Sequence, residues 1–412
     1  MSKPSRTADA QTKPAAAEER PLSSRGLTPT FILALGTFAV GTDAFVVAGF
    51  LPQMAESLRV SESTAGQSVT VFAAAYALLS PVLATVTARL PRKQLLLVAL
   101  AVLTAGNVLA ALAPNFAVLV VARVTAAAGA AMYTPNAGAV GAALVRPELR
   151  ARALAVVIGG LTVATAVGIP LGNVISHVLD WRSALIAVAV LSVLAGIGIH
   201  AVMPKMPGGQ AVPLRTRLSV LRRPAVLRVL PLTVLGMTAC YTAYAYTVPT
   251  LQAVGAGEAV ALMLLLYGLG AVAGNFAAGY ATDRWGAARV LTIGYVCMAV
   301  TLGALGWLAA AGAAFLPVVG LLMAGWGGSS WCQTPPQQHR LIEAAPHEAP
   351  LVVSLNSSGI YLGIGLGTVL GGATLPTGVP LVCAIGAGIA VLALAFLTLT
   401  ARRSPGTVPD VA

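Results

Sequence analysis

Residues 184–228 read ALIAVAVLSVLAGIGIHAVM PKMPGGQAVPLRTRLSVLRRPAVLR, an unbroken apolar run followed by a basic segment rich in proline and glycine. A hydrocarbon core about 30 Å thick needs about 20 apolar residues at a helical rise of 1.5 Å per residue. Residues 184–203 supply that length and are expected to cross a membrane as one helix. Segment 204–228 is the longest polar stretch inside the chain, so it should separate two groups of helices.

Comparable apolar runs lie on both sides of this segment, six before it and six after it. The predicted spans are 29–52, 67–88, 94–113, 116–144, 153–176, 184–203, 229–250, 259–281, 288–311, 314–336, 351–373 and 380–400. The composition agrees, because 57% of the 412 residues are hydrophobic and only 9% are charged, whereas soluble domains carry about 25% charged residues. A cytosolic enzyme, a disordered chain and a nucleic-acid-binding domain are therefore excluded, despite the net charge of +12.

The positions of the basic residues predict the orientation. Alternate segments, counted from an inner N-terminus, hold 22 of the 25 Lys and Arg residues, and the outer loops hold only Arg59 and Arg182. Since cytoplasmic loops carry the excess of Lys and Arg, both termini are expected in the cytoplasm. Residues 1–28 should form a disordered tail and residues 401–412 a second tail. The four cysteines stand singly in apolar runs, so no metal site is expected.

The chain contains an internal repeat with an offset close to 200 residues. The repeated features are Leu35-Gly36 with Leu235-Gly236, Thr42 with Thr242, Thr134-Pro135 with Thr334-Pro335, and the row Gly160, Ala164, Gly168, Gly172 with Gly359, Gly363, Gly367, Gly371. Two related halves with a site near the membrane midplane are known among secondary transporters. We therefore predict an all-α membrane protein of two pseudo-symmetric six-helix bundles, 29–203 and 229–400, joined by the cytoplasmic linker 204–228.

The two rows of small residues predict close helix contacts. Residues four apart share one face of a helix, and small side chains there let two backbones approach. Such faces suit helices that slide during a conformational change, although static packing uses them as well.

Several short motifs accompany the repeat. The loop after the eighth span reads GYATDRWGAAR over 279–289, and the loop after the second span reads ATVTARLPRK over 84–93, without the aspartate and both glycines. Span four contains LVVAR at 119–123, span five contains GLTVATAVGIPLG at 160–172, and span one contains GTDAF at 41–45.

In this order and at these spans, the motifs resemble those of the major facilitator superfamily over residues 28–400. Within it, the chain is similar to the twelve-span drug:proton antiporters close to bacterial sugar-efflux and chloramphenicol-efflux transporters. The resemblance implies the major facilitator fold, a bacterial plasma (inner) membrane location and a latch between the halves that uses the loop aspartate. The residues that it assigns to conformational motifs are Arg89, Arg92, Gly160, Gly168, Pro170, Gly172, Gly279, Asp283, Arg284, Gly286 and Arg289.

Asp43 is the acidic residue that lies well inside a predicted span, and Arg123 is its basic counterpart. Each costs about 2.5–3.5 kcal/mol to insert and normally faces a partner or a cavity. Helix rise places the two at nearly equal depth, so we expect them to approach each other. Protonation of Asp43 would then release Arg123 and couple transport to protons. Asp43 could instead cap a broken helix near Gly41, and Arg123 could hydrogen-bond backbone carbonyls.

Polar and aromatic residues in three later spans are candidates for a substrate cavity. They are Tyr241, Tyr244, Trp331, Gln333, Asn356, Ser357 and Tyr361. Aromatic faces suit flat, lipophilic or cationic compounds, and apolar pockets with few polar groups are the usual ligand environment. The same aromatics could simply pack or form interface belts.

The sequence thus predicts a proton-coupled antiporter that exports a small amphipathic molecule by rocker-switch motion. We expect a monomer in the lipid bilayer, with protons and a small-molecule substrate as partners, no nucleic acid, no metal and no cofactor beyond the proton gradient. It is not expected to be an enzyme, since no nucleophile–base pair or phosphate-binding loop occurs. The alternatives are a sugar, nucleoside or metabolite exporter and, from another class, a non-transporting membrane receptor.

Overall fold

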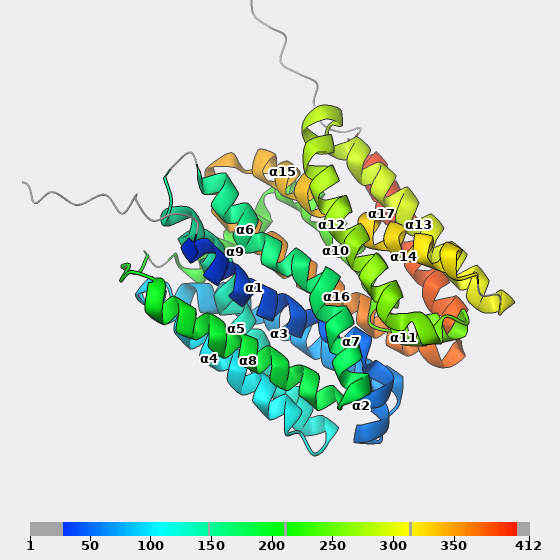
Figure 1. Cartoon of the computed structure of the whole chain (residues 1–412). Helices are drawn as coiled ribbons and strands as arrows, with labels where there is room; N and C mark the ends of the chain where they lie inside the picture. The colour runs from blue at the N-terminus through cyan, green and yellow to red at the C-terminus, as the bar shows by residue number, and fades with distance from the viewer. Residues whose placement is uncertain (1–27, 147–148, 210–211, 313–314, 402–412) are drawn as a thin grey trace, which may run out of the picture.

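The computed structural model describes residues 28–146, 149–209, 212–312 and 315–401, and all regular secondary structure in these ranges is helical. Apart from Thr28 and Ala401, the two predicted tails lie outside the described residues. The helices form two groups, which lie side by side (Figure 1).

The first group, here called the N half, runs from α1 to α8. Its elements are α1 (Thr28–Phe45), the 3₁₀ turn η1 (Val46–Gly49), α2 (Leu51–Leu58), α3 (Glu62–Val86), α4 (Arg92–Ala111), α5 (Phe116–Ala143), α6 (Arg150–Val163), the π-helical turn η3 (Ala164–Gly168), α7 (Ile169–Val178) and α8 (Trp181–Val202).

The second group, here called the C half, runs from α10 to α17. Its elements are α10 (Pro224–Tyr244), α11 (Thr247–Ala253), the turn η5 (Gly257–Ala259), α12 (Val260–Trp285), α13 (Ala287–Ala311), α14 (Leu316–Trp331), α15 (Thr334–Ala344), the turn η6 (Pro346–Glu348), α16 (Ala349–Thr374), the turn η7 (Leu375–Thr377) and α17 (Val379–Ala401).

The connection between the halves contains the short helix α9 (Leu214–Ser219) and the turn η4 (Val220–Arg222). It lies against the loop between α3 and α4. The Gly209 N–H donates to the Ala88 carbonyl at 2.8 Å, and the Arg92 N–H donates to the Met206 carbonyl at 3.1 Å. We call this end of the molecule the linker end.

Eleven of the described helical segments are long and apolar enough to cross a membrane. The tenth predicted span, 314–336, does not add a twelfth, because α14 ends at Trp331 and α15 begins at Thr334. Two consecutive prolines, Pro335 and Pro336, follow Thr334. Proline lacks a backbone N–H, so it favours the start of a helix over its interior. The count of twelve crossings therefore remains a prediction.

Both rows of small residues pack against the first long helix of their own half. A Cβ atom built on Gly160 would lie 2.3 Å from the Ala34 carbonyl oxygen on α1, and one on Gly168 would lie 2.3 Å from Thr42 Oγ1. In the C half, a Cβ on Gly367 would lie 2.6 Å from the Thr238 carbonyl oxygen on α10. The rows thus bring two backbones together within each half, and they do so at equivalent places.

Direct contact between the halves is concentrated away from the linker end. There α3 packs against α16, α12 against η3 and α7, and α11 against η1 and α2 (Figure 1). A Cβ on Gly268 of α12 would lie 2.2 Å from Ala166 Cα in η3. Glycine at this position lets the two halves touch backbone to backbone.

Candidate functional site: a buried ion pair beside an aromatic cluster

Asp43 near the end of α1 and Arg123 of α5 form an ion pair inside the N half. Arg123 Nη1 lies 2.7 Å from Asp43 Oδ1, and Nη2 donates to the Asp43 carbonyl oxygen at 3.1 Å. The two side chains are 0% and 1% exposed. The approach expected from their depths is therefore present, and both charges are sequestered from solvent.

The pair is held by neighbours on two other helices. The guanidinium carbon of Arg123 lies 4.4 Å from the centre of the Phe72 ring on α3, a cation–π arrangement. The buried side chain of Asn107 on α4 lies beside the Asp43 carboxylate. Asp43 Oδ2 and Arg123 Nε nevertheless have no hydrogen-bond partner among the residues that the structure describes. Buried charges are usually fully satisfied, so this pair retains an open acceptor where a proton could bind.

Six aromatic side chains gather next to the pair, and we call them the interface aromatic cluster. They are Phe45, Tyr241, Tyr244, Tyr267, Trp326 and Trp331. Phe45 belongs to the N half and follows Asp43 by two residues, whereas the other five come from α10, α12 and α14 of the C half. The Phe45 ring centre lies 6.0 Å from Tyr241, 6.3 Å from Tyr244 and 6.1 Å from Trp331. The cluster thus crosses from one half to the other.

A second aromatic contact crosses the halves between α3 and α16. Tyr76 and Tyr361 stack with ring centres 3.6 Å apart and an interplanar angle of 21°, and Phe72 lies 6.2 Å from Tyr361. Since Phe72 also covers Arg123, the ion pair is connected to the C half through one aromatic ring.

One polar group of the interface aromatic cluster is buried without a hydrogen-bond partner among the described residues. It is the hydroxyl of Tyr244, a residue that is 2% exposed. The Trp326 indole Nε1 lies beside the Cys240 thiol instead. An unsatisfied buried polar group costs about 1–3 kcal/mol. Each such group in a native structure calls for an explanation, and a ligand that supplies an acceptor would provide one.

The predicted cavity residues fall into two sets. Tyr241, Tyr244, Trp331 and Tyr361 lie in the aromatic contacts between the halves.

The remaining three candidates make hydrogen bonds inside the C half. Gln333 accepts from Tyr295 Oη at 3.3 Å, Asn356 accepts from Thr233 Oγ1 at 2.8 Å, and Ser357 donates to the Val353 carbonyl at 3.3 Å. These contacts connect helices of the C half or turns of one helix.

Sequence reasoning missed Gln337, which lies one residue beyond the predicted span 314–336. Gln337 is buried and donates to Thr233 Oγ1 at 3.0 Å, while Arg340 donates to its amide oxygen at 3.1 Å. Together with Asn356 these residues form a polar chain between α15, α10 and α16. The spacing Gln333–Gln337, one helical turn, is a signal in the sequence that could have indicated it.

The loop motifs lie at the linker end. Arg89 is exposed, and Arg92 donates through Nη1 to Asn136 Oδ1 at 2.9 Å. In the C half, Gly286 joins α12 to α13 with φ of +82° and ψ of 150°, a conformation that only glycine adopts readily.

The charged members of the C-half loop motif, Asp283, Arg284 and Arg289, are exposed, and none forms an ion pair with a described residue. A Cβ on the remaining member, Gly279, would meet no atom within 4 Å. In this conformation, the charged members of the loop therefore form no ion pair across the halves with the described residues.

In span five, Pro170 occupies the first turn of α7, directly after the π-helical turn η3. A Cβ on Gly172 would lie 2.1 Å from Val46 Cγ2 in η1. The motif of span five thus packs against the end of α1, close to Asp43 in sequence.

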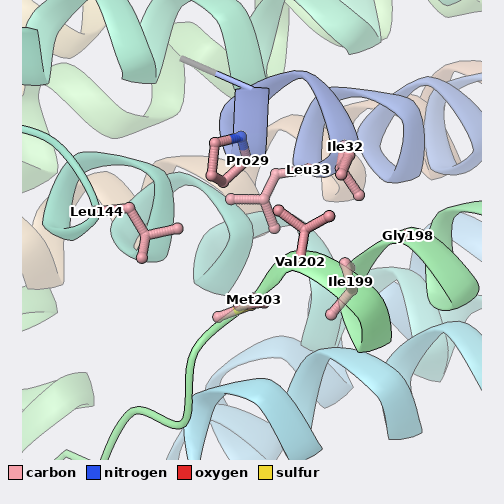
Figure 2. Close-up of a pocket in the computed structure, with 8 residues that line it drawn as sticks. All are labelled: Pro29, Ile32, Leu33, Leu144, Gly198, Ile199, Val202 and Met203. Carbon is pink, nitrogen blue, oxygen red and sulfur yellow. The ribbon is translucent and has the colours of Figure 1, made fainter. Parts of the chain in front are cut away.

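A small pocket lies elsewhere, between the start of α1 and the end of α8. Figure 2 shows its lining, which is entirely apolar and includes Leu33, Leu144 and Met203. No group of three or more His, Cys, Asp or Glu side chains among the described residues could hold a metal ion. The ion pair and the interface aromatic cluster are accordingly the candidate site.

Comparison with known proteins identifies relatives over most of the chain. The family model of the Major Facilitator Superfamily matches residues 33–349 and 257–411. The chain is 32% identical to the inner membrane transport protein YdhP of Escherichia coli, over 92% of this chain and 97% of that one. It is 30% identical to YbcL of Bacillus subtilis, an uncharacterised MFS-type transporter, over 88% of this chain and 94% of that one.

Solved structures share the fold at low sequence identity. A bacterial homologue of the human lysosomal transporter Spinster has a TM-score of 0.69 at 17% identity and covers 94% of this chain and 100% of its own. A POT family transporter has a TM-score of 0.72 at 13% identity and covers 92% and 96%. At these identities the likeness concerns the fold alone.

Proposed function

Because the chain belongs to the major facilitator superfamily, and is thus a multi-pass inner-membrane transport protein, we propose that it is a proton-coupled antiporter. In this proposal it exports a small amphipathic compound, such as an antibiotic, by rocker-switch movement of the two halves. The proton gradient supplies the energy, and the transporter works as a monomer without a cofactor.

The observation behind this proposal is the buried pair of Asp43 and Arg123. An ionisable residue at this depth is costly and in membrane proteins commonly belongs to an ion pathway. A proton arriving at the open Oδ2 atom would neutralise Asp43 and weaken its bond to Arg123. Each proton that moves inward across 100 mV yields about 2.3 kcal/mol. Protonation at this site could therefore drive a change between two arrangements.

The contacts between the halves offer a route from protonation to movement. Asp43 precedes Phe45 by two residues, and Phe45 contacts Tyr241, Tyr244 and Trp331 of the C half. On the other side of the pair, Phe72 links Arg123 to Tyr361. A shift of either charged side chain would disturb an aromatic contact between the halves, so protonation would favour their separation at the end opposite the linker.

The nearest alternative is an exporter of a sugar, nucleoside or other metabolite that uses the same pair. Aromatic rings also stack on sugar and base rings, so the cluster is compatible with either cargo. A receptor that binds a ligand without transporting it is the more distant alternative. A measurement of ligand flux across a membrane distinguishes the receptor, which shows none, from both exporters.

The test compares wild type with Asp43→Asn in a bacterial host depleted of its own efflux pumps. At matched membrane expression, wild type should raise the inhibitory concentration of at least one antibiotic or nucleoside analogue, and Asp43→Asn should abolish that increase. Asp180→Asn is the matched control, since the Asp180 side chain is 45% exposed and pairs with Arg182 outside the candidate site. In liposomes, export by wild type should be accompanied by proton movement in the opposite direction. Export that persists in Asp43→Asn with unchanged proton movement would refute the coupling role.

A further inference from the structure

We infer that the cargo is uncharged, that it presents a planar face and that it carries at least one hydrogen-bond acceptor. This inference rests on the proposed function, since it assigns the cargo to the contact between the halves. The inference restricts the possible substrates to neutral compounds and excludes organic cations and organic anions.

The first argument concerns charge. Among the Asp, Glu, Lys and Arg residues in the described candidate spans, Asp43 and Arg123 alone lie more than five residues from both ends of their span. They are in contact with each other and neutralise each other. The interface aromatic cluster beside them contains only Phe, Tyr and Trp. With Asp43 ionised, the site therefore has no net charge to offer a ligand.

Protonation makes the site positive, never negative. When Asp43 accepts a proton, the Arg123 guanidinium remains charged, because arginine keeps its proton in proteins. A cationic ligand would thus meet a neutral site in one state and a repulsive site in the other. Aromatic rings of the cluster attract cations, but the Arg123 guanidinium, 4.4 Å from the Phe72 ring centre, keeps a positive charge beside them. A lipophilic cation would be dehydrated without a counter-charge, which is strongly unfavourable.

An anion fails for a different reason. Arg123 could pair with an anionic ligand only after Asp43 has released it, so proton binding and anion binding would favour each other. Mutual reinforcement of that kind produces movement of both species in the same direction. An exchange of cargo for protons needs the opposite coupling. A cation would meet this condition only at the desolvation cost given above, whereas a neutral compound that competes with one arrangement of the pair meets it without that cost.

The shape and polarity of the cluster define the remaining features. Tyr244 contacts Phe45, Tyr241, Tyr267 and Trp326, with ring centres between 4.9 and 6.3 Å apart. Aromatic surfaces of this kind pack best against another flat ring. The hydroxyl of Tyr244 has no hydrogen-bond partner among the described residues, and a hydroxyl can donate as well as accept. A carbonyl, nitro, ether or hydroxyl oxygen on the cargo would satisfy it.

The test is a panel of five toxic probes in the pump-depleted host. Chloramphenicol and 5-fluorouridine are neutral, ethidium and tetraphenylphosphonium are cations, and nalidixate is an anion. Wild type should protect against at least one neutral probe and against none of the charged ones. For the purified full chain in lipid nanodiscs, Tyr244→Phe should raise the Kd of the protective neutral probe about threefold to tenfold. Tyr295→Phe is the control and should leave this Kd unchanged, because the buried Tyr295 hydroxyl donates to Gln333 and to the Leu232 carbonyl inside the C half.

Three results would overturn the inference. The first is protection against either cation at matched expression. The second is protection against nalidixate in an alkaline medium, where its carboxyl group is ionised and the probe is an anion. The third is no protection against any of the five probes, because a site of this composition should accept one of the two neutral rings.

The proposed function fails separately. If a neutral probe is exported without proton movement, and Asp43→Asn exports it equally well, the inference on cargo stands and proton coupling is refuted. If ethidium is exported in exchange for protons and Asp43→Asn abolishes this exchange, the antiporter stands and the inference on cargo is refuted.

Discussion

The two halves of this transporter share a packing scheme and differ in where they place charge. A Cβ on Gly36 would lie 2.1 Å from Tyr133 Oη, and a Cβ on Gly236 would lie 2.0 Å from Gln333 Oε1. Gly236 and Gln333 each follow their counterparts, Gly36 and Tyr133, by 200 residues. Thr42 and Thr242 both donate to the carbonyl four residues earlier, at 2.9 and 2.7 Å. These positions are equivalent in chemistry as well as in sequence.

The charged pair breaks this equivalence. At the same offset, Ala243 stands for Asp43 and Met323 for Arg123, and both replacements are 0% exposed. The C half therefore shows that the scaffold packs without the ions. Replacing a buried ion pair by apolar residues is often neutral or stabilising. We conclude that stability does not explain why the N half keeps its pair, which favours a role in transport.

The largest effect on stability is expected when one residue of the charged pair is replaced by its C-half counterpart and the other is kept. Arg123→Met alone leaves a buried carboxylate without its partner and should lower the free energy of unfolding by about 3–5 kcal/mol at neutral pH. The double variant Asp43→Ala, Arg123→Met removes both charges and should recover most of this loss while remaining inactive in proton exchange. Unfolding in mixed detergent micelles and proton flux in liposomes measure the two properties. A double variant as unstable as the single one would mean that the pair is needed for folding.

The fold could be predicted from the sequence because its signals are local and strong. A run such as 184–203 can be recognised as a membrane span from its length and composition alone. The spacing of the repeated glycines identifies a helix face even when the helix that packs against it is unknown. Asp43 and Arg123 could be matched by depth, since helix rise converts residue number directly into distance.

The site could be predicted only in part, because aromatic and amide side chains do not reveal their partners. Tyr244 and Asn356 looked alike as candidates, yet Tyr244 contacts Phe45 of the other half and Asn356 bonds Thr233 of its own. The contributions of Phe45 and Trp326 depend on tertiary packing between distant segments. The break between α14 and α15 was readable from Pro335-Pro336, whereas the single Pro135 lies inside the unbroken helix α5.

The second prediction concerns the contact at which the halves meet. Gly268→Val would drive a side chain into the backbone of Ala166 and should disfavour this closed contact by about 1–3 kcal/mol. Spin labels at the exposed positions Glu56 of α2 and Gln252 of α11, in a cysteine-free background, should then report a longer distance than in wild type.

Gly303→Val is the control for Gly268→Val, because a Cβ at Gly303 meets no atom within 4 Å. An unchanged label distance in Gly268→Val, with the protein folded, would contradict the assignment of this contact to the boundary between the halves.

The third prediction tests the polar chain that the C half has and the N half lacks. At the repeat offsets, Leu33 and Val157 occupy the places of Thr233 and Asn356. Thr233→Val leaves the Asn356 amide oxygen and the Gln337 amide without Thr233, and should cost about 1–3 kcal/mol of unfolding free energy. Thr292→Val, whose exposed hydroxyl bonds only its own helix, should change it by less. Equal losses in the two variants would show that the chain between α10, α15 and α16 adds nothing.

The last prediction concerns the loops of the linker end, where the two halves connect equivalent helices with different backbone conformations, and its control variant carries the smallest expected effect. Gly286 turns α12 into α13 with φ of +82°, while its counterpart Pro91 has φ of −51°, and there the Gly209 and Met206 backbones of the linker support the loop. Gly286→Ala should cost about 1–3 kcal/mol, because a Cβ is strained in this conformation. Gly388→Ala, inside α17 and facing open space, should stabilise by about 0.5–1 kcal/mol. If the free energy of unfolding falls in Gly286→Ala and rises in Gly388→Ala, the backbone angle explains why glycine is needed in the C-half loop. Changes of the same sign would contradict this explanation.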